Sequence, residues 1–392
     1  HVYSAGNNGT GDCGYGAGGG WGNITGGYKQ GKNVIACGNL NYLDALENSS
    51  SRGPASDGRV KPDICANGAG QMSTDGPNTY QVGGGTSAAC PGIAGIVTQL
   101  HEAFRDLNAG SNADGGLVKA CLLNSAEDLG NPGPDYKFGW GRVNAFRAVT
   151  TLEDNRYQID QISQGGNNTH TITVPAGMNQ VRIMMYWADY EGDPLAVKQL
   201  VNDINMTVTD PNGITYNPWI LNPAPNAATL NANAVRGIDD LNNMEQVTLD
   251  LPAAGTYTVN IDGFLIPQGP ETYYLVYEFR GSEINVTYPI GYEGFVPGET
   301  ETIRWDAFGN NGTFTVEYST DNGTSWTVAS NAVAANTRQY NWVVPASVTA
   351  EALIRVTRGS VSGQSPETFS IIGDPQNIIV DWACPDSIKI SW

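Results

Sequence analysis

Helical periodicity is confined to the first part of this 392-residue chain. Up to about residue 153, short apolar strands such as residues 33–36 alternate with two apolar helical segments, which begin at Thr86 and near Leu117. Alternation of strands and helices predicts an α/β fold. After Asp154 the helical pattern ends, and segments of period two are separated by Pro, Gly, Asn and Asp. This change predicts that all-β domains follow the α/β region.

The length of the chain also indicates several domains, because a single hydrophobic core rarely grows to this size. We expect an α/β region at residues 1–153, a β-sandwich at residues 154–282 and a second β-sandwich at residues 283–373. Residues 374–392 contain two strand-like segments. Two strands cannot close a core by themselves, so this segment is expected to begin a further β domain.

The charge of the chain excludes some partners. It has 39 Asp and Glu against 20 Lys and Arg, a net charge of −19, which repels nucleic acids and anionic membranes. A run of about 18 apolar residues would be needed for a membrane-spanning helix, and the sequence has none. Cysteine spacing does not resemble a zinc site. Cys90 and Cys121 lie in apolar helical segments and are expected to be buried thiols, while pairing among the others stays open.

A serine lies among small residues at the start of the first helical segment, in Gly83–Pro91. The first N–H groups of a helix have no partner within the helix, so an oxyanion formed beside Ser87 would meet a hydrogen-bond donor. By itself, Gly-Thr-Ser before a helix is also an ordinary N-cap. The motif therefore needs support from the rest of the sequence.

That support comes from further segments in the same order as in a known family. Gly85–Pro91 resembles the nucleophile motif of subtilisin-like serine peptidases, or subtilases, which usually reads Gly-Thr-Ser-Met-Ala-x-Pro; Ala88 replaces the usual Met. The other segments that resemble family motifs are Ser4–Gly9, Ser50–Pro54, Asp57–Asp63, Gly133–Tyr136 and Gly139–Asn144. The resemblance thus covers residues 4–144 and implies that the α/β region is part of a subtilisin-like domain.

The resemblance also implies roles for individual residues. Ser87 would attack the scissile carbonyl, and the side-chain amide of Asn7 and the backbone N–H of Ser87 would stabilise the oxyanion. Ser4, Ala5 and Gly6 would form one wall of the primary specificity pocket. The aspartate and general-base histidine of the family lie on segments that precede the strand carrying the oxyanion asparagine, which is Asn7 here. No residue of this sequence matches them.

None of the three histidines is expected to act as the base. His101 lies fourteen residues after Ser87 on the same predicted helix, roughly 21 Å away at 1.5 Å per residue. His1 occupies a position that the family does not use for catalysis, and His170 lies in the β-rich region, where we expect a surface strand residue. We expect an N-terminal peptidase segment, covalent or associated, to carry the Asp and His. The alternative is a catalytically inactive surface protein that functions in adhesion or binding.

The β-rich regions resemble accessory modules of secreted proteins. The second region resembles the jelly-roll domain that follows some alkaline bacterial subtilisins, the third resembles bacterial immunoglobulin-like modules, and the last resembles the first strands of a fibronectin type III domain. The segments that carry these resemblances are 185–189, 200–205, 216–219, 245–247, 254–259, 267–270, 303–305, 317–323, 340–342, 378–380 and 388–392.

Together these features predict a secreted or surface-held bacterial serine endopeptidase that acts on proteins or peptides and is exported by type IX secretion. Its chemistry needs no cofactor. Carboxylates in the turns at Asn202–Asp203 and Asp239–Asp240 either supply oxygen ligands to a structural Ca²⁺ or are solvated, and metal ligands are not assigned.

Overall fold

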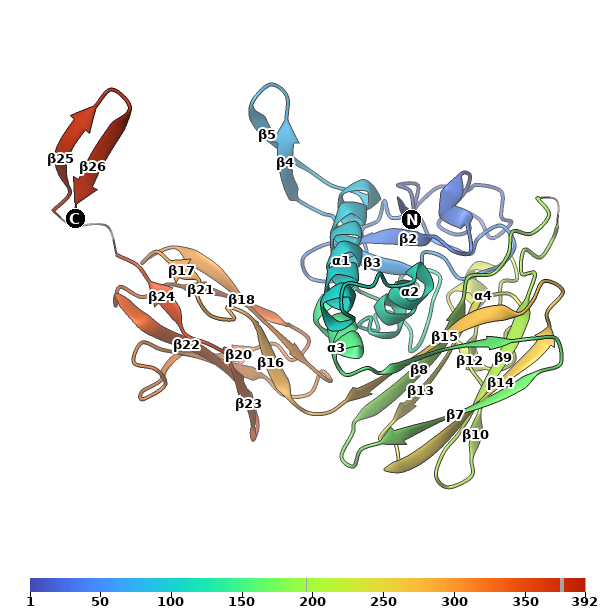
Figure 1. Cartoon of the computed structure of the whole chain (residues 1–392). Coiled ribbons are helices and arrows are strands. Elements are labelled where there is room, and N and C mark those ends of the chain that lie inside the picture. The colour runs from blue at the N-terminus through green and yellow to red at the C-terminus, as the bar shows by residue number, and fades with distance from the viewer. Residues whose placement is uncertain (195, 374–376, 392) are drawn as a thin grey trace. The chain divides into compact units, whose positions relative to one another are not determined.

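The computed structural model describes residues 1–194, 196–373 and 377–391 (Figure 1). Contacts divide the chain into two compact units, His1–Arg280 and Gly281–Trp392. The predicted order, an α/β region followed by β-rich domains, is confirmed. None of the helices in the described residues combines the length and the apolar character that crossing a membrane requires.

The first unit begins with a parallel three-stranded sheet in the order β1 (Val2–Ser4), β2 (Ile35–Leu40) and β3 (Ile64–Asn67). Every residue of β2 is buried, as expected of a central parallel strand. The remaining elements of this region are the 3₁₀ turn η1 (Tyr28–Gln30), the exposed hairpin β4 (Gln71–Asp75) and β5 (Thr79–Gly83), and the helices α1 (Thr86–Leu107), α2 (Gly115–Asn124) and α3 (Ala145–Glu153).

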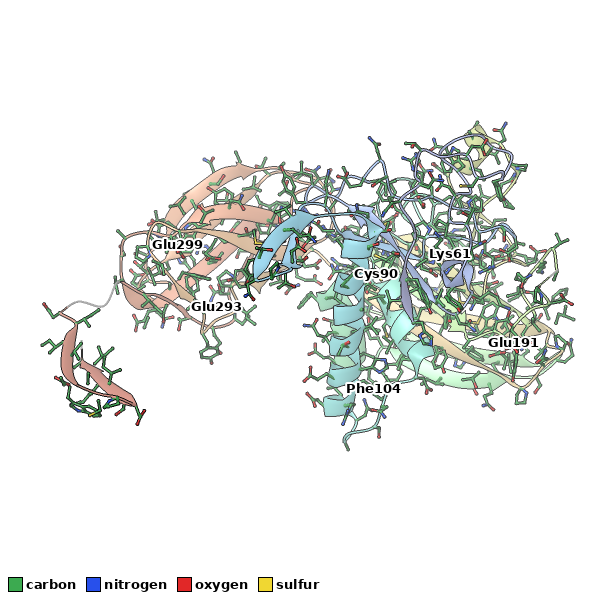
Figure 2. The ribbon with its side chains drawn as sticks, turned by 90° about the horizontal axis from the view of Figure 1, so that it is seen from above. Lys61, Cys90, Phe104, Glu191, Glu293 and Glu299 are labelled. Carbon is green, nitrogen blue, oxygen red and sulfur yellow. The ribbon has the colours of Figure 1, made fainter. Side chains whose placement is uncertain are left out.

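Helix α1 packs against the sheet through one apolar stripe. Ala89, Ile93 and Leu100 are fully buried, and Ile96 and Phe104 add to the same face. Spacings of three and four residues place these side chains on one side of an α-helix. Figure 2 shows Cys90 in the first turns of α1 and Phe104 toward its other end. The stripe fixes the direction of the helix and therefore the position of its N-terminus.

An antiparallel β-sandwich completes the first unit. One sheet has the order β13-β8-β15-β6 and the other β10-β9-β14-β7. Their bounds are β6 (Tyr157–Ile162), β7 (Asn167–Val174), β8 (Gln180–Trp187), β9 (Asp203–Thr209), β10 (Thr215–Tyr216), β13 (Met244–Asp250), β14 (Gly255–Leu265) and β15 (Glu271–Arg280). A short helix, α4 (Ala227–Leu230), and the strand pair β11 (Trp219–Ile220) and β12 (Val235–Arg236) lie in the connection before β13.

Strand β8 is buried on both of its faces. Ile183 and Met185 point into the core between the two sheets, whereas Met184 and Tyr186 belong to the core formed with α1 and α2. Buried ion pairs add to this contact: Arg147 Nη1 lies 2.7 Å from Glu278 Oε1. The helical region and the sandwich, expected to meet near residue 153, therefore share one hydrophobic core.

The described strands of the second unit pair antiparallel, except in one parallel pair. This unit begins at Gly281, and the sequence predicts a boundary between residues 282 and 283. Its core includes Trp305, Phe314, Trp342 and Phe369. The strands are β16 (Ile284–Tyr288), β17 (Gly294–Phe295), β18 (Thr300–Ala307), β19 (Phe314–Ser319), β20 (Thr327–Val333), β21 (Gln339–Val343), β22 (Thr349–Arg358), β23 (Val361–Gln364) and β24 (Phe369–Ile371).

The last strands form a hairpin, β25 (Ile379–Cys384) with β26 (Ser387–Ser391). Residues 374–376 and 392 of the predicted fibronectin-like segment lie outside the described residues. The six cysteines, all within the described residues, are free thiols; Cys121 is buried as predicted, and Cys90 is half-buried.

Candidate active site

Ser87 is the second residue of α1, and its side chain is exposed. The N–H groups of Ala88 and Ala89 both donate to the carbonyl oxygen of Gly85, at 3.0 and 3.2 Å, so helical bonding begins there. The N–H of Thr86 donates to Asn7 Oδ1 at 2.9 Å. The N–H of Ser87 has no acceptor among the described residues, as expected for the first turn of a helix.

The side-chain oxygen of Asn7 forms hydrogen bonds with the start of α1. Its Oδ1 accepts hydrogen bonds from both the N–H and the hydroxyl of the buried Thr86, at 2.9 and 3.0 Å. The same hydroxyl accepts the N–H of Gly6 at 3.1 Å. These bonds fix the orientation of the amide, and its Nδ2 has no acceptor among the described residues. Asn7 and Ser87 therefore present two free N–H donors next to one exposed hydroxyl.

Gly85 is required at this junction for two reasons. Its φ of +105° lies in the region that L side chains rarely adopt. A Cβ atom built on it would also lie only 3.0 Å from Asn7 Nδ2 and 3.1 Å from Asn7 Oδ1. A side chain at residue 85 would thus displace the Asn7 amide from its position beside the helix.

The residues expected to form a pocket wall follow the carboxyl end of β1. Ser4 ends the strand, and the buried Ala5 continues the pairing through an N–H that donates to the carbonyl of Cys37 at 2.9 Å. The carbonyl of Gly6 accepts the N–H of Ser51 at 2.8 Å. The carboxyl ends of parallel strands are the usual location of ligand sites in α/β folds. The structure thus brings Ser4–Gly6, Asn7 and the N-terminus of α1 together.

The histidines lie elsewhere. His1 and His101 both line a cavity of about 360 Å³ that also contains Asp114 and Lys119 and touches Val2. This cavity lies at the start of β1, whereas Asn7 follows the end of that strand. His170 is in β7, where Nε2 lies 2.6 Å from the hydroxyl of Tyr273 and burial lowers the pKa of the imidazole. None of these positions brings a histidine to the end of β1, where Asn7 lies beside the start of α1.

A buried charge cluster supports the sheet beneath the site. Asp63 accepts hydrogen bonds from the N–H of Ala36, at 2.7 Å, and from Lys61, and its Oδ1 lies 3.0 Å from Lys119 Nζ. Burial raises the pKa of Asp63, but Lys119 and Lys61 outweigh it and hold the value below normal. Burial lowers the pKa of Lys61 to about 7. The cluster connects β2 and α2 to the residues that directly precede β3. Figure 2 labels Lys61.

Sequence reasoning found Asp63 and Lys61 in a family motif but missed Lys119 and Thr86. Lys119 is the one charged residue in an otherwise apolar helix, which is a signal that a buried ion pair was needed. Thr86 lies inside the nucleophile motif, and its bridge to Asn7 depends on a contact between distant segments.

The turns considered for calcium carry their own hydrogen bonds. Asp239 accepts the N–H groups of Leu241 and Asn242, at 2.9 and 3.0 Å. Asp203 Oδ2 lies 3.4 Å from Lys198 Nζ. Within the described part of the chain, no three or more His, Cys, Asp or Glu side chains are grouped to hold a metal ion. Calcium binding therefore stays a prediction without assigned ligands.

The model of the subtilase family matches residues 1–141. A serine protease/ABC transporter B family protein, tagA of Dictyostelium discoideum, is 25% identical over 274 residues, which are 59% of this chain and 15% of that protein. The membrane-bound transcription factor site-1 protease of Mus musculus is 28% identical over 189 residues, 46% of this chain and 16% of that protein.

A PII-type proteinase of Lacticaseibacillus paracasei is 26% identical over 272 residues, 62% of this chain and 13% of that protein. The chain thus spans less than a fifth of the length of these relatives. Among solved structures, the self-cleaved protease domain of PatA matches with a TM-score of 0.31 and 22% identity, covering 39% of this chain and 49% of that chain.

Proposed function

Because residues 1–141 belong to the subtilase family of serine peptidases, we propose that Ser87 is the nucleophile of a subtilisin-type endopeptidase. The observation that carries this proposal is the arrangement of Ser87 at the start of α1, with its own N–H and the Asn7 amide free to donate. The substrates are peptide bonds in proteins or peptides.

In the proposed reaction, Ser87 Oγ attacks the carbonyl carbon and loses its proton to a general base. The carbonyl oxygen becomes an oxyanion that accepts hydrogen bonds from Asn7 Nδ2 and the N–H of Ser87. As this intermediate collapses, the C–N bond breaks and the protonated base gives its proton to the departing amine. Water then hydrolyses the acyl-enzyme that remains. In subtilisin, the asparagine donor contributes about 3 kcal/mol to transition-state stabilisation, and we take this value as the guide for Asn7.

We propose that an N-terminal peptidase segment, covalent or associated, supplies the aspartate and the general-base histidine. Supporting this, β1 pairs only with β2 among the described strands, so its other edge presents unpaired backbone groups. Such an edge is normally covered or paired. The placement of His1, His101 and His170 away from Ser87 agrees with a base from another segment.

The accessory regions suggest where the enzyme works. We propose that residues 154–282 form a jelly-roll domain and residues 283–373 an immunoglobulin-like domain of a secreted or surface-held bacterial protein, exported by type IX secretion. The acidic net charge of −19 and the abundance of Gly, at 49 residues, support an extracellular protein. Structural calcium belongs to the same proposal.

Hydrolysis of casein by the full-length, processed protein tests the proposed function. We expect activity to fall by at least about a thousandfold in Ser87→Ala. The matched control is Ser73→Ala, a change of an exposed serine on the hairpin just before α1, which should leave hydrolysis unchanged. If the unaltered protein does not hydrolyse casein or peptides, the adhesion or binding alternative takes its place.

A further inference from the structure

Lys29 lies beside the proposed pocket wall. It is in η1, the turn that precedes β2, and its side chain is half-buried. A Cβ atom built on Gly6 would lie 2.8 Å from Lys29 Nζ and 2.9 Å from Ser51 Oγ. Gly6 immediately precedes Asn7, so the ammonium group approaches the backbone one residue from the proposed oxyanion donor. Gly6 has no side chain, and this leaves room for the ammonium group of Lys29.

This ammonium group differs from those of the buried lysines of the region. Lys32 is paired with Asp189 at 2.5 Å, and Lys61 and Lys119 are both paired with Asp63. No Asp or Glu of the described residues forms an ion pair with Lys29. Burial lowers its pKa, and the nearby Cys13 thiol opposes that shift. In a chain with a net charge of −19, an unpaired and half-buried cation is unusual.

We propose that Lys29 determines specificity by pairing with a side-chain carboxylate, Glu or Asp, on the substrate residue whose carbonyl Ser87 attacks. This inference rests on the proposed function. In this proposal, Asn7 Nδ2 binds the carbonyl oxygen of the substrate residue. The side chain of that residue is attached to the Cα atom next to the carbonyl carbon and would pass Gly6. A carboxylate there would satisfy an ammonium group that has no acidic partner in the described protein.

Comparison of paired substrates tests this specificity. Five peptides that differ only in the residue before the scissile bond, Glu, Gln, Lys, Phe or Ala, are offered to the full-length, processed protein. We expect kcat/KM for Glu to exceed that for Gln by about tenfold or more. Lys29→Gln should abolish the preference for the Glu peptide over the Gln peptide. Lys29→Glu should make the Lys peptide the preferred substrate. Lys198→Gln, a change of a partly exposed lysine in the sandwich, is the matched control and should retain the preference for the Glu peptide.

A binding measurement separates this inference from the proposed function. In Ser87→Ala, calorimetry compares peptides ending in Glu and in Gln, which are the products of the same cleavage. Tighter binding of the Glu peptide that is lost in Ser87→Ala/Lys29→Gln supports the role of Lys29 even if the protein hydrolyses nothing. Equal binding and equal hydrolysis of Glu and Gln peptides would overturn it. A preference for small residues such as Ala would also overturn it, because Lys29 would then only fill the pocket.

Discussion

Single residues at the start of α1 fix the geometry around Ser87, the proposed nucleophile. Thr86 connects three parts of the site, because its hydroxyl donates to Asn7 Oδ1 and accepts from the N–H of Gly6. Gly85 leaves room for the Asn7 amide. Each of these contacts joins residues that are about 80 positions apart in the chain. The orientation of the Asn7 amide is therefore a property of the tertiary structure.

Replacing Asn7 tests its proposed role in the oxyanion hole. Asn7→Ala should lower kcat in the full-length protein by about 10²–10³-fold and change KM little, because the lost bond forms mainly in the transition state. Steady-state peptide hydrolysis measures both constants. Asn8→Ala, at the next exposed asparagine, is the control. Equal kcat values for the two variants would remove Asn7 from the oxyanion hole.

Thr86 provides a second test at this scale. Thr86→Val keeps the shape of the side chain but removes both of its hydrogen bonds, so we expect unfolding free energy to fall by about 1–3 kcal/mol. Thr98→Val is a matched change on the exposed side of the same helix, where the hydroxyl bonds only to Ala94, and should cost less than about 0.5 kcal/mol. Urea unfolding monitored by tryptophan fluorescence distinguishes them. Similar losses in both variants would contradict the bridging role.

At the scale of elements, the sequence predicts more where motifs are local. Ser87 and Asn7 can be proposed from the sequence because short segments carry them, and α1 can be predicted because its apolar residues recur every three or four positions. The sequence predicts a β-sandwich over residues 154–282, which include β8, but the burial of β8 on both faces depends on α2 packing against it. The approach of Lys29 to Gly6 has no sequence pattern, since it arises from the fold of the loop before β2.

Strand β15 carries a carboxyl group that predicts a pH dependence of stability. Burial raises the pKa of Glu271, at the start of β15, to about 7, above the ordinary 4.5. The folded state therefore binds more protons than the unfolded state between these values, so stability should fall as pH rises from about 4.5 to 7. Thermal unfolding across this range should show the fall, and Glu271→Gln should reduce its slope. A slope identical to that of the exposed-residue control, Glu153→Gln, would argue against this assignment.

At the scale of the whole molecule, the serine-bearing region and the sandwich form one unit with a shared core. Met184 and Tyr186 of the sandwich belong to one hydrophobic cluster with residues of α1 and α2, and α2 packs against β8. The second unit has a core of its own. The sandwich is therefore part of the structure that positions Ser87.

Shared packing predicts that the first unit unfolds cooperatively. Met184→Ala should lower the unfolding free energy of residues 1–280 by roughly 2–5 kcal/mol, because it opens a cavity in the shared core. Val316→Ala, in the core of the second unit, should affect only that unit. Hydrogen exchange by mass spectrometry reports on each region separately. Faster exchange in the sandwich of Met184→Ala without faster exchange in α1 and α2 would show that they unfold independently.

Labelling with a fluorophosphonate tests the central claim most directly. The full-length, processed protein would be treated with the reagent and digested, and the modified residue located by mass spectrometry. Our account predicts one covalent adduct, on Ser87, which is absent in Ser87→Ala and present in Ser73→Ala. Absence of labelling, or an adduct on another residue, would contradict the assignment of Ser87 as the nucleophile.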